Sequence, residues 1–157
     1  MQSKLLQYGS LLILLFVAGC DSAPQISEAD QPTEVIKLTQ TGCQFLETES
    51  EDFKFKTTQA DDCKEVNANT LEKRKAGFKP LALKPGKYIF EVTNRDVPYA
   101  LGFYLRGEGF NQVTLPKVSG GDLNQGQTQS YEITLKPGNY VFSCPLNPTP
   151  DYPVIVQ

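Results

Sequence analysis

Residues 135–145 have the sequence Leu135-Lys136-Pro137-Gly138-Asn139-Tyr140-Val141-Phe142-Ser143-Cys144-Pro145. A Pro-Gly turn here leads into a run of aromatic and β-branched residues, which is typical of a turn followed by a β-strand. The first eight residues resemble an octad that begins 52 residues earlier, Leu83-Lys84-Pro85-Gly86-Lys87-Tyr88-Ile89-Phe90. Two copies are too few for a solenoid. We therefore expect two turn-and-strand entries on facing sheets of a β-sandwich.

Further strands are predicted from short segments rich in aromatic and β-branched residues, separated by Pro and Gly. The glycine-rich segment Val118–Asp122 lacks the lysine and the helix of a phosphate-binding loop, so it predicts a turn or bulge between strands. The fold class that follows is all-β, a sandwich of short strands. The predicted strands comprise residues 33–38, 88–92, 100–105, 129–135 and 140–143.

One short helix is expected before the second half of the chain. Asn69 and Glu72 have the spacing of a capping box, residues 71–76 are good helix formers, and Gly77 is a terminating glycine. The preceding residues, 39–62, are charged and irregular. Cys43 lies within this stretch and Cys63 directly follows it. A disulfide between these cysteines would close a loop of about 20 residues and stabilise the fold by about 3 kcal/mol.

The N-terminus has the features of an export signal. An apolar run from Leu11 to Val17 is too short to span a bilayer and ends in Val17-Ala18-Gly19-Cys20, which resembles the lipobox of bacterial lipoproteins. An ordinary secretory signal or an uncleaved anchor are the alternatives. We expect residues 1–19 to be a signal peptide, residues 20–32 a flexible tether acylated at Cys20, and residues 33–157 one domain. Asp21 resembles the signal that retains lipoproteins in the inner membrane.

Composition and charge exclude several functions. The net charge is −3 and no basic cluster is present, so nucleic acid is not an expected partner. The chain contains neither a histidine that could act as a base nor a Gly-x-Ser-x-Gly motif, so we do not expect an enzyme. The expected partners are the membrane, through the lipid anchor, and another protein of the cell envelope outside the cytoplasm.

Two segments carry a resemblance to a known family. The first is Leu83–Asn94 followed by Val97-Pro98-Tyr99, and the second extends from Gly126 through residues 137–145 to Val154-Ile155-Val156. Together they resemble the cupredoxins, the Greek-key β-sandwich family that includes plastocyanin and azurin. This resemblance covers residues 33–157 and implies a cupredoxin-like Greek-key β-sandwich.

The same resemblance implies where copper ligands would lie. Cys144 stands at the copper cysteine, Tyr99 at the first histidine, and Asn147 and Tyr152 at the second histidine and the methionine. A blue-copper site needs two imidazoles and a thiolate. The chain has no histidine, and its single methionine is Met1, so a His-ligated copper site is excluded and no cofactor is expected.

The vacated positions leave alternatives open. Cys144 could be an exposed thiol that binds Cu(I) or reacts with thiols, an inert packed residue, or half of a disulfide. Tyr99 and Tyr152 could bind a ligand or fill the space of the lost site. Asn147 lies in a loop with four prolines, residues 145–153, whose stiffness favours a docking surface. We therefore expect an interaction module, with metal binding or thiol redox chemistry at Cys144 as the alternative.

Overall fold

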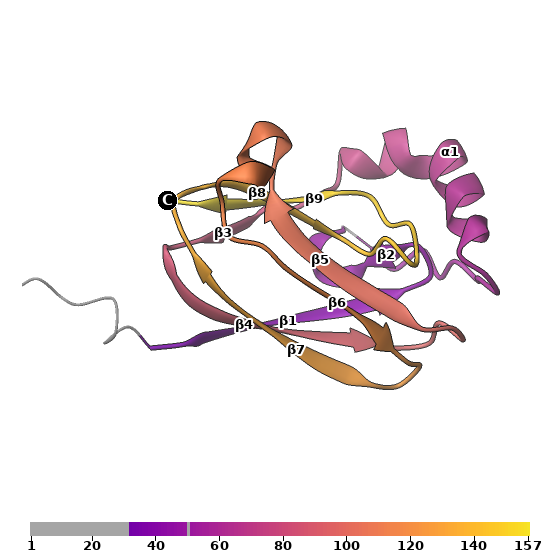
Figure 1. Ribbon diagram of the computed structural model, residues 1–157. Helices are drawn as coiled ribbons and strands as arrows, with labels where there is room; N and C mark the ends of the chain where they lie inside the picture. The colour runs from indigo at the N-terminus through magenta and orange to yellow at the C-terminus, as the bar shows by residue number, and fades with distance from the viewer. Residues whose placement is uncertain (1–31, 50) are drawn as a thin grey trace, which may run out of the picture.

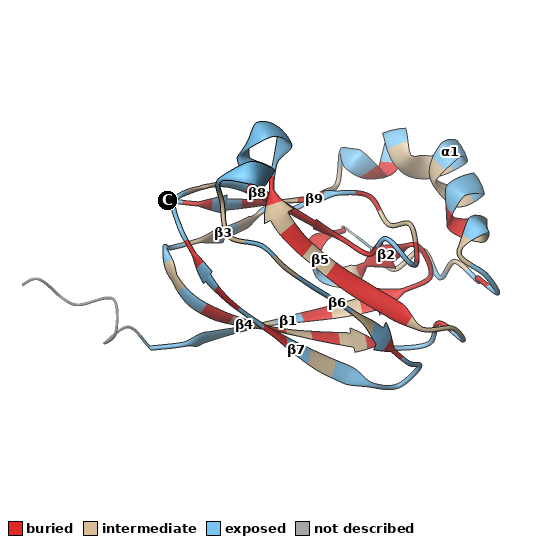
Figure 2. Ribbon diagram, in the orientation of Figure 1, coloured by how far each residue is buried: buried red, intermediate tan, exposed pale blue. Residues whose placement is uncertain are grey.

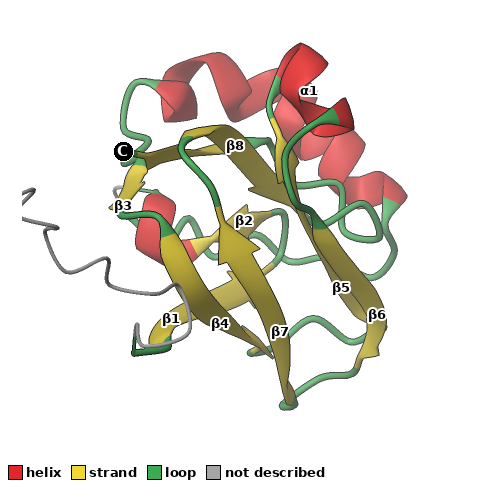
Figure 3. Cartoon of the chain, turned by 60° about the vertical axis from the view of Figure 1, so that its left-hand side comes forward, coloured by secondary structure: helices red, strands yellow, loops and turns green. Residues whose placement is uncertain are grey.

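The computed structural model describes residues 32–49 and 51–157, and the predicted signal peptide and tether lie outside them. Two sheets pack face to face (Figures 1 and 3). The four-stranded sheet has the order β2-β1-β4-β7 and the five-stranded sheet the order β3-β9-β8-β5-β6. The strands are β1 (Glu34–Thr41), β2 (Gln44–Phe45), β3 (Leu81–Leu83), β4 (Gly86–Asn94), β5 (Leu101–Gly107), β6 (Val118–Leu123), β7 (Thr128–Leu135), β8 (Gly138–Ser143) and β9 (Tyr152–Val156).

The connections between strands form a Greek key. The hairpin partners β5 and β6 are antiparallel, the chain then crosses to β7 in the other sheet, and β8 returns to pair with β5 on the side opposite β6. A fourth strand that returns to lie beside the first is the defining step of this motif. The predicted all-β Greek-key sandwich is therefore confirmed.

The repeated octad has a structural role that its sequence did not reveal. Tyr88 on β4 donates its hydroxyl proton to the Lys84 carbonyl at 2.9 Å, and Tyr140 on β8 donates to the Lys136 carbonyl at 3.0 Å. Each tyrosine thereby bonds back across its own Pro-Gly turn and fixes the entry angle of the strand, as tyrosine corners do in other sandwiches. The two copies lie on facing sheets, as predicted.

Aromatic side chains fill the space between the sheets. Phe45, Phe103, Phe142 and Tyr152 are at most 1% exposed. The Phe45 ring lies edge-on to the Phe142 ring at 4.9 Å between centroids, a preferred geometry for aromatic pairs. Along β4 and β7 buried residues alternate with half-buried or exposed ones (Figure 2), as expected of strands with one face on the core.

The glycine-rich segment 118–122 was predicted as a turn or bulge, and this prediction is wrong in part. It forms β6, an edge strand, although the β5–β6 register does shift between Leu101 and Phe103. Gly120 is required because a Cβ there would lie 2.7 Å from Cε1 of the Tyr131 ring. The local composition predicted a turn, whereas the glycine admits a close aromatic contact across the sandwich.

The predicted helix exists but begins earlier than expected. Helix α1 covers Asp61–Lys75, so Asn69 lies inside it and not at its start. The start is organised by Asp62, whose carboxylate accepts the backbone N–H of Thr58 at 2.7 Å and that of Gln59 at 3.2 Å. These bonds lower the Asp62 pKa. The end near Gly77 is as predicted, because the Gly77 N–H donates to the Arg74 carbonyl. The described residues also form the 3-10 helices η2 (Leu46–Thr48) and η3 (Gly109–Val113).

Two features concern stability and the membrane. The predicted disulfide joins Cys43 to Cys63 in the first turn of α1, so this prediction is confirmed. Across residues 32–49 and 51–157, we find no helix with the length and apolar character that a membrane span requires.

Candidate functional site

Cys144 directly follows β8 and is completely buried. Its Sγ accepts hydrogen bonds from the backbone N–H of Gly102 at 3.3 Å and of Asn147 at 3.2 Å. Among the described cysteines it is the one outside a disulfide. Burial raises the pKa of the thiol, and the N–H bonds offset this only in part. A protonated, inaccessible thiol is a poor nucleophile, since the thiolate is the reactive form.

Asn147 is also completely buried, and its amide makes several polar contacts. Nδ2 donates to the Thr41 carbonyl at 3.0 Å, while Oδ1 accepts the Tyr99 hydroxyl at 3.0 Å and the Cys43 N–H at 3.4 Å. Oδ1 also lies 2.9 Å from Sγ of Cys63, which has no proton to donate because it is disulfide-bonded. Asn147 therefore joins the loop after β8 to the disulfide and to the end of β1. Its side chain thus links segments that are far apart in the sequence.

Tyr99 reaches the same position from the loop between β4 and β5. Its hydroxyl lies 3.0 Å from Asn147 Oδ1 and 3.3 Å from the Gln59 carbonyl. Burial raises the Tyr99 pKa, and the charges of Asp62 and Cys144 add to the effect. The structure thus brings together three of the four predicted positions, Tyr99, Cys144 and Asn147, in one hydrogen-bonded arrangement.

Tyr152, the fourth predicted position, points elsewhere. Its hydroxyl donates to Glu49 Oε1 and accepts the Phe45 N–H at 3.3 Å, and its ring packs against Phe142 and Phe78. Burial raises its pKa, and the negative charge of Glu49 raises it further. The predicted pocket around Cys144 therefore does not include the Tyr152 hydroxyl, because β9 aims this side chain into the core toward residues 45–49.

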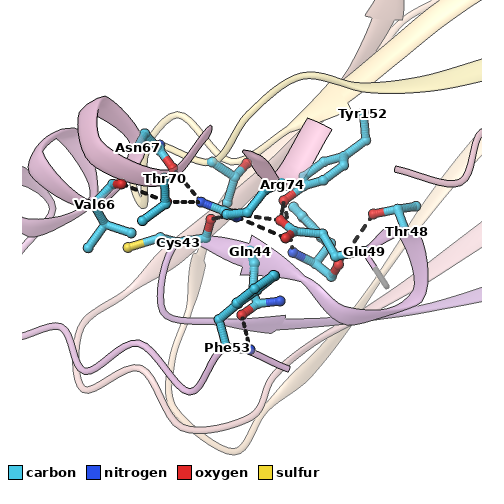
Figure 4. A network of polar contacts seen from close by, with 12 residues as sticks. Cys43, Gln44, Thr48, Glu49, Phe53, Val66, Asn67, Thr70, Arg74 and Tyr152 are labelled. Carbon is cyan, nitrogen blue, oxygen red and sulfur yellow. Dashed lines mark hydrogen bonds and ion pairs between the residues drawn. The ribbon is translucent and has the colours of Figure 1, made fainter. Parts of the chain in front are cut away.

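A buried ion pair lies beside Tyr152 (Figure 4). Arg74, in the last turn of α1, donates to Glu49 through Nε at 2.9 Å and Nη2 at 2.5 Å, and both side chains are only 1% exposed. The remaining guanidinium donors reach the Cys43 carbonyl at 3.0 Å and Asn67 Oδ1 at 2.8 Å. A bidentate pair with every remaining polar group bonded is the arrangement in which a buried charge is tolerated.

The proline-rich loop, residues 145–153, is held by hydrogen bonds to α1, to Cys144 and to Arg106. Asn67 on α1 donates to the Pro148 carbonyl at 2.6 Å. Within the loop, Thr149 Oγ1 accepts the Cys144 N–H at 2.9 Å, and the Thr149 N–H donates to the Cys144 carbonyl at 3.3 Å. At the far end of the loop, Asp151 accepts two bonds from Arg106, at 2.7 and 2.8 Å. The loop is therefore fixed in one conformation at several points.

An open groove lies next to this loop. Leu146 is 48% exposed at its rim, and Pro145, Gly102, Gly120 and Gly121 line it together with the strand faces. Gly120 is exposed and Gly121 is half-buried, so no side chain covers the backbone at these two lining positions. The apolar side chain and uncovered backbone together offer a contact surface.

Sequence reasoning missed Arg74, Glu49 and Asn67. Most polar side chains of α1 are exposed to solvent or half-buried. Nothing in the local sequence distinguishes Arg74 from Lys73 or Lys75. The composition of the helix gave one indication. Because α1 is too polar to pack through an apolar stripe, polar contacts or covalent bonds must hold it against the sandwich. The sequence could not show which residue does so.

Comparison with solved structures finds a likeness of fold. No protein-family model matches the chain, and no curated protein matches it. Among solved structures, auracyanin B is similar, with a TM-score of 0.49 and 12% identity over 82% of this chain and 91% of that chain. The order of strands in the two sheets carries the assignment of the fold. The fold is cupredoxin-like.

The donors near Cys144 do not fit the copper site of a cupredoxin. The chain has no histidine, and no cluster of His, Cys, Asp or Glu within residues 32–49 and 51–157 could hold a metal ion. Asn147 and Tyr99 hydrogen-bond to each other and to the backbone, where a soft metal would require imidazole or sulfur ligands. We therefore derive no copper chemistry for this site.

Cys144 should be unreactive in the folded protein. In a Cys20→Ser variant of the chain from residue 20, we expect alkylation at pH 8 at least about 100-fold slower than in denaturant, because the thiol is buried and protonated. The folded pKa is raised above the unfolded value, so its contribution to stability is complete below pH ~9 and is lost as the pH rises. Above pH ~9 the unfolding free energy of this variant should therefore fall more steeply with pH than that of the matched Cys20→Ser/Cys144→Ser variant. Rapid native alkylation, or identical pH profiles, would contradict this description.

Proposed function

We propose that this protein is a lipid-anchored interaction module that has kept the cupredoxin-like sandwich without a His-ligated copper site. The observation that carries the proposal is the fixed proline-rich loop, whose backbone and side chains bond to α1, to the Cys43–Cys63 disulfide and to Cys144. A surface already ordered before binding loses less conformational entropy when a partner binds. The exposed Leu146 and the neighbouring groove are the proposed contact, with another envelope protein as partner.

The anchor is proposed from the lipobox-like sequence that ends at Cys20. Several acyl chains on one cysteine hold a protein at a membrane far better than a single chain, because each buried methylene contributes about 0.8 kcal/mol. We propose a location outside the cytoplasm, on the periplasmic face of the cell membrane, and Asp21 favours the inner membrane. Binding, and not catalysis, is the proposed activity.

The alternative function is Cu(I) binding or thiol redox chemistry through Cys144. The free thiol with two N–H donors favours it. Its complete burial, its raised pKa and its oxygen-bearing neighbours argue against it. The interaction role is therefore preferred.

Acylation of Cys20 has a direct test. The chain expressed with its own signal in a bacterial host should appear in the membrane fraction, with an intact mass that corresponds to residues 20–157 plus a diacylglyceryl group and acyl chains. A Cys20→Ala variant should lack this added mass. An unmodified Cys20 in the recovered wild-type protein would refute the anchor.

The docking surface can be tested with a matched pair of substitutions. Leu146 and Val35 are 48% and 49% exposed, and Val35 lies on β1 at the other end of the sandwich. In pull-downs from detergent-solubilised envelopes, Leu146→Asp should reduce recovery of the partner at least about tenfold, the effect expected of an anchor residue worth 1–2 kcal/mol. Val35→Asp should leave recovery unchanged. Equal recovery with both variants would count against the loop as the contact.

A further inference from the structure

One end of the sandwich carries features that the proposed docking surface does not use. The described chain begins at this end, because Glu34 at the start of β1 pairs with Tyr88 at the start of β4. The end of β7 is here too, through the pair Gly86 and Leu135. In the other sheet, Gly138 pairs with Val156 and Gly107 with Tyr140. Only two residues join β3 to β4, so these strand ends belong to the same end of the molecule.

Two exposed apolar side chains project from this end. Phe110 is 98% exposed and Val113 is 85% exposed, and both lie on η3, which directly follows β5. Residues three apart on a 3-10 helix lie above one another, so the two side chains form a single apolar projection. Figure 2 shows this short helix as an exposed turn that projects from the five-stranded sheet.

The projection is held in place by the sandwich. The Glu108 N–H donates to the Asn139 carbonyl at 2.9 Å, and the Leu115 N–H donates to the Asn111 carbonyl at 2.8 Å. Gly107 admits the Asn111 backbone so closely that a Cβ there would lie 2.4 Å from it. Leu115 packs over Gly138 on β8. The fold thus presents Phe110 and Val113 to solvent from a fixed base, which is unusual for a large aromatic side chain.

Lysines surround this projection. Both copies of the repeated octad place an exposed Lys-Pro-Gly turn here, with Lys84 and Lys136, and Lys87 follows the first turn. Pro32, Glu34, Lys84 and Lys87 line one small surface pocket, so two lysines lie beside the point where the described chain begins. Lys117 follows η3 and is exposed. Three glutamates also lie at this end, Glu34, Glu108 and Glu132, so the four lysines leave it with a small excess of positive charge in a chain whose net charge is −3.

We propose that this end, the tether-end face formed by Phe110, Val113 and the lysines at 84, 87, 117 and 136, lies on an anionic membrane surface. Phe110 and Val113 insert at the boundary between headgroups and acyl chains, and the lysines bind the lipid phosphates. Such insertion reaches about 5–10 Å, and lysines near the surface are attracted to an anionic leaflet. The orientation that results directs the Leu146 loop away from the membrane, toward a partner.

The inference rests on the anchor of the proposed function, and the length of the tether supports it. Twelve residues separate Cys20 from Thr33, and the root-mean-square length of a random coil of twelve residues is about 20 Å. The anchor therefore keeps this end of the domain close to the bilayer. Because the protein is already held there, insertion of Phe110 and Val113 and binding of lipid phosphates by the lysines can each be weak and still orient the domain.

The chain contains no tryptophan, so a single substitution supplies a unique fluorescent reporter. We would prepare residues 20–157 without lipid as a Phe110→Trp variant and a Leu146→Trp variant. Cys20, the accessible thiol, would be coupled to maleimide lipid in vesicles of phosphatidylcholine and phosphatidylglycerol that carry brominated acyl chains. Trp at position 110 should shift to the blue and lose about half its emission or more, because the side chain would lie about 5–10 Å deep. Trp at position 146 should do neither.

A second pair of variants tests the lysines. Lys84→Glu/Lys136→Glu, placed in the Phe110→Trp background, should abolish the quenching, whereas the charge-matched Lys56→Glu/Lys64→Glu should retain it. Absent quenching at position 110, equal quenching at positions 110 and 146, or no effect of the lysine reversals would overturn the proposal. A concentration-dependent blue shift without vesicles would also overturn it, since a second copy would then cover the face. Because the coupling supplies the anchor chemically, failure of native acylation would appear in the mass of Cys20 and not in this experiment.

Discussion

The ion pair between Arg74 and Glu49 is the interaction on which the candidate site depends. Helix α1 is too polar to bury an apolar stripe, so hydrophobic packing alone cannot hold it against the sandwich. The disulfide holds its first turn through Cys63, and Arg74 holds its last turn. Cys43 takes part in both, because its sulfur bonds to Cys63 and its carbonyl accepts a guanidinium proton. Removal of one partner would leave an uncompensated buried charge, which costs about 3–5 kcal/mol.

This fixed helix explains how the Cys144 end of the sandwich is closed. Asn67 bonds to the proline-rich loop, and Asn147 in that loop bonds to the backbone of the disulfide segment. Tyr99 reaches the same place and shares the Asn147 oxygen. Hydrogen bonds between oxygen and nitrogen groups thus hold this end of the sandwich together. The result is a surface already ordered before binding, which is the property an interaction module needs.

The sequence predicted those features that depend on local patterns. Pro-Gly turns and alternating aromatics identify strands such as β4 and β8, and the spacing of Cys43 and Cys63 favoured the disulfide that the structure contains. The start of α1 was missed because two capping signals compete, and the one at Asp62 acts on residues before the helix. The role of Arg74 could not be predicted, since its partner Glu49 is 25 residues away and only the fold brings them together.

The same limit applies to the candidate site. Family spacing placed Tyr99, Cys144 and Asn147 correctly relative to one another, but it also placed Tyr152 among them. Tyr152 on β9 pairs with Phe142 on β8, and its hydroxyl donates to Glu49, which is distant in the sequence. Long-range pairing of buried polar groups is decided by tertiary structure, which a motif cannot encode.

Amide hydrogen exchange in the loop tests the central claim, that α1 and its buried ion pair hold the docking surface in one conformation. In the wild-type chain, the amides of Asn147 and Thr149 should be protected at least about 100-fold relative to an unfolded chain, because both are hydrogen-bonded. In Arg74→Lys this protection should fall by about tenfold or more while that of Phe90 in β4 persists, and the surface control Lys75→Ala should behave as wild type. Loop amides that exchange freely in the wild type, or that keep full protection in Arg74→Lys, would contradict the account.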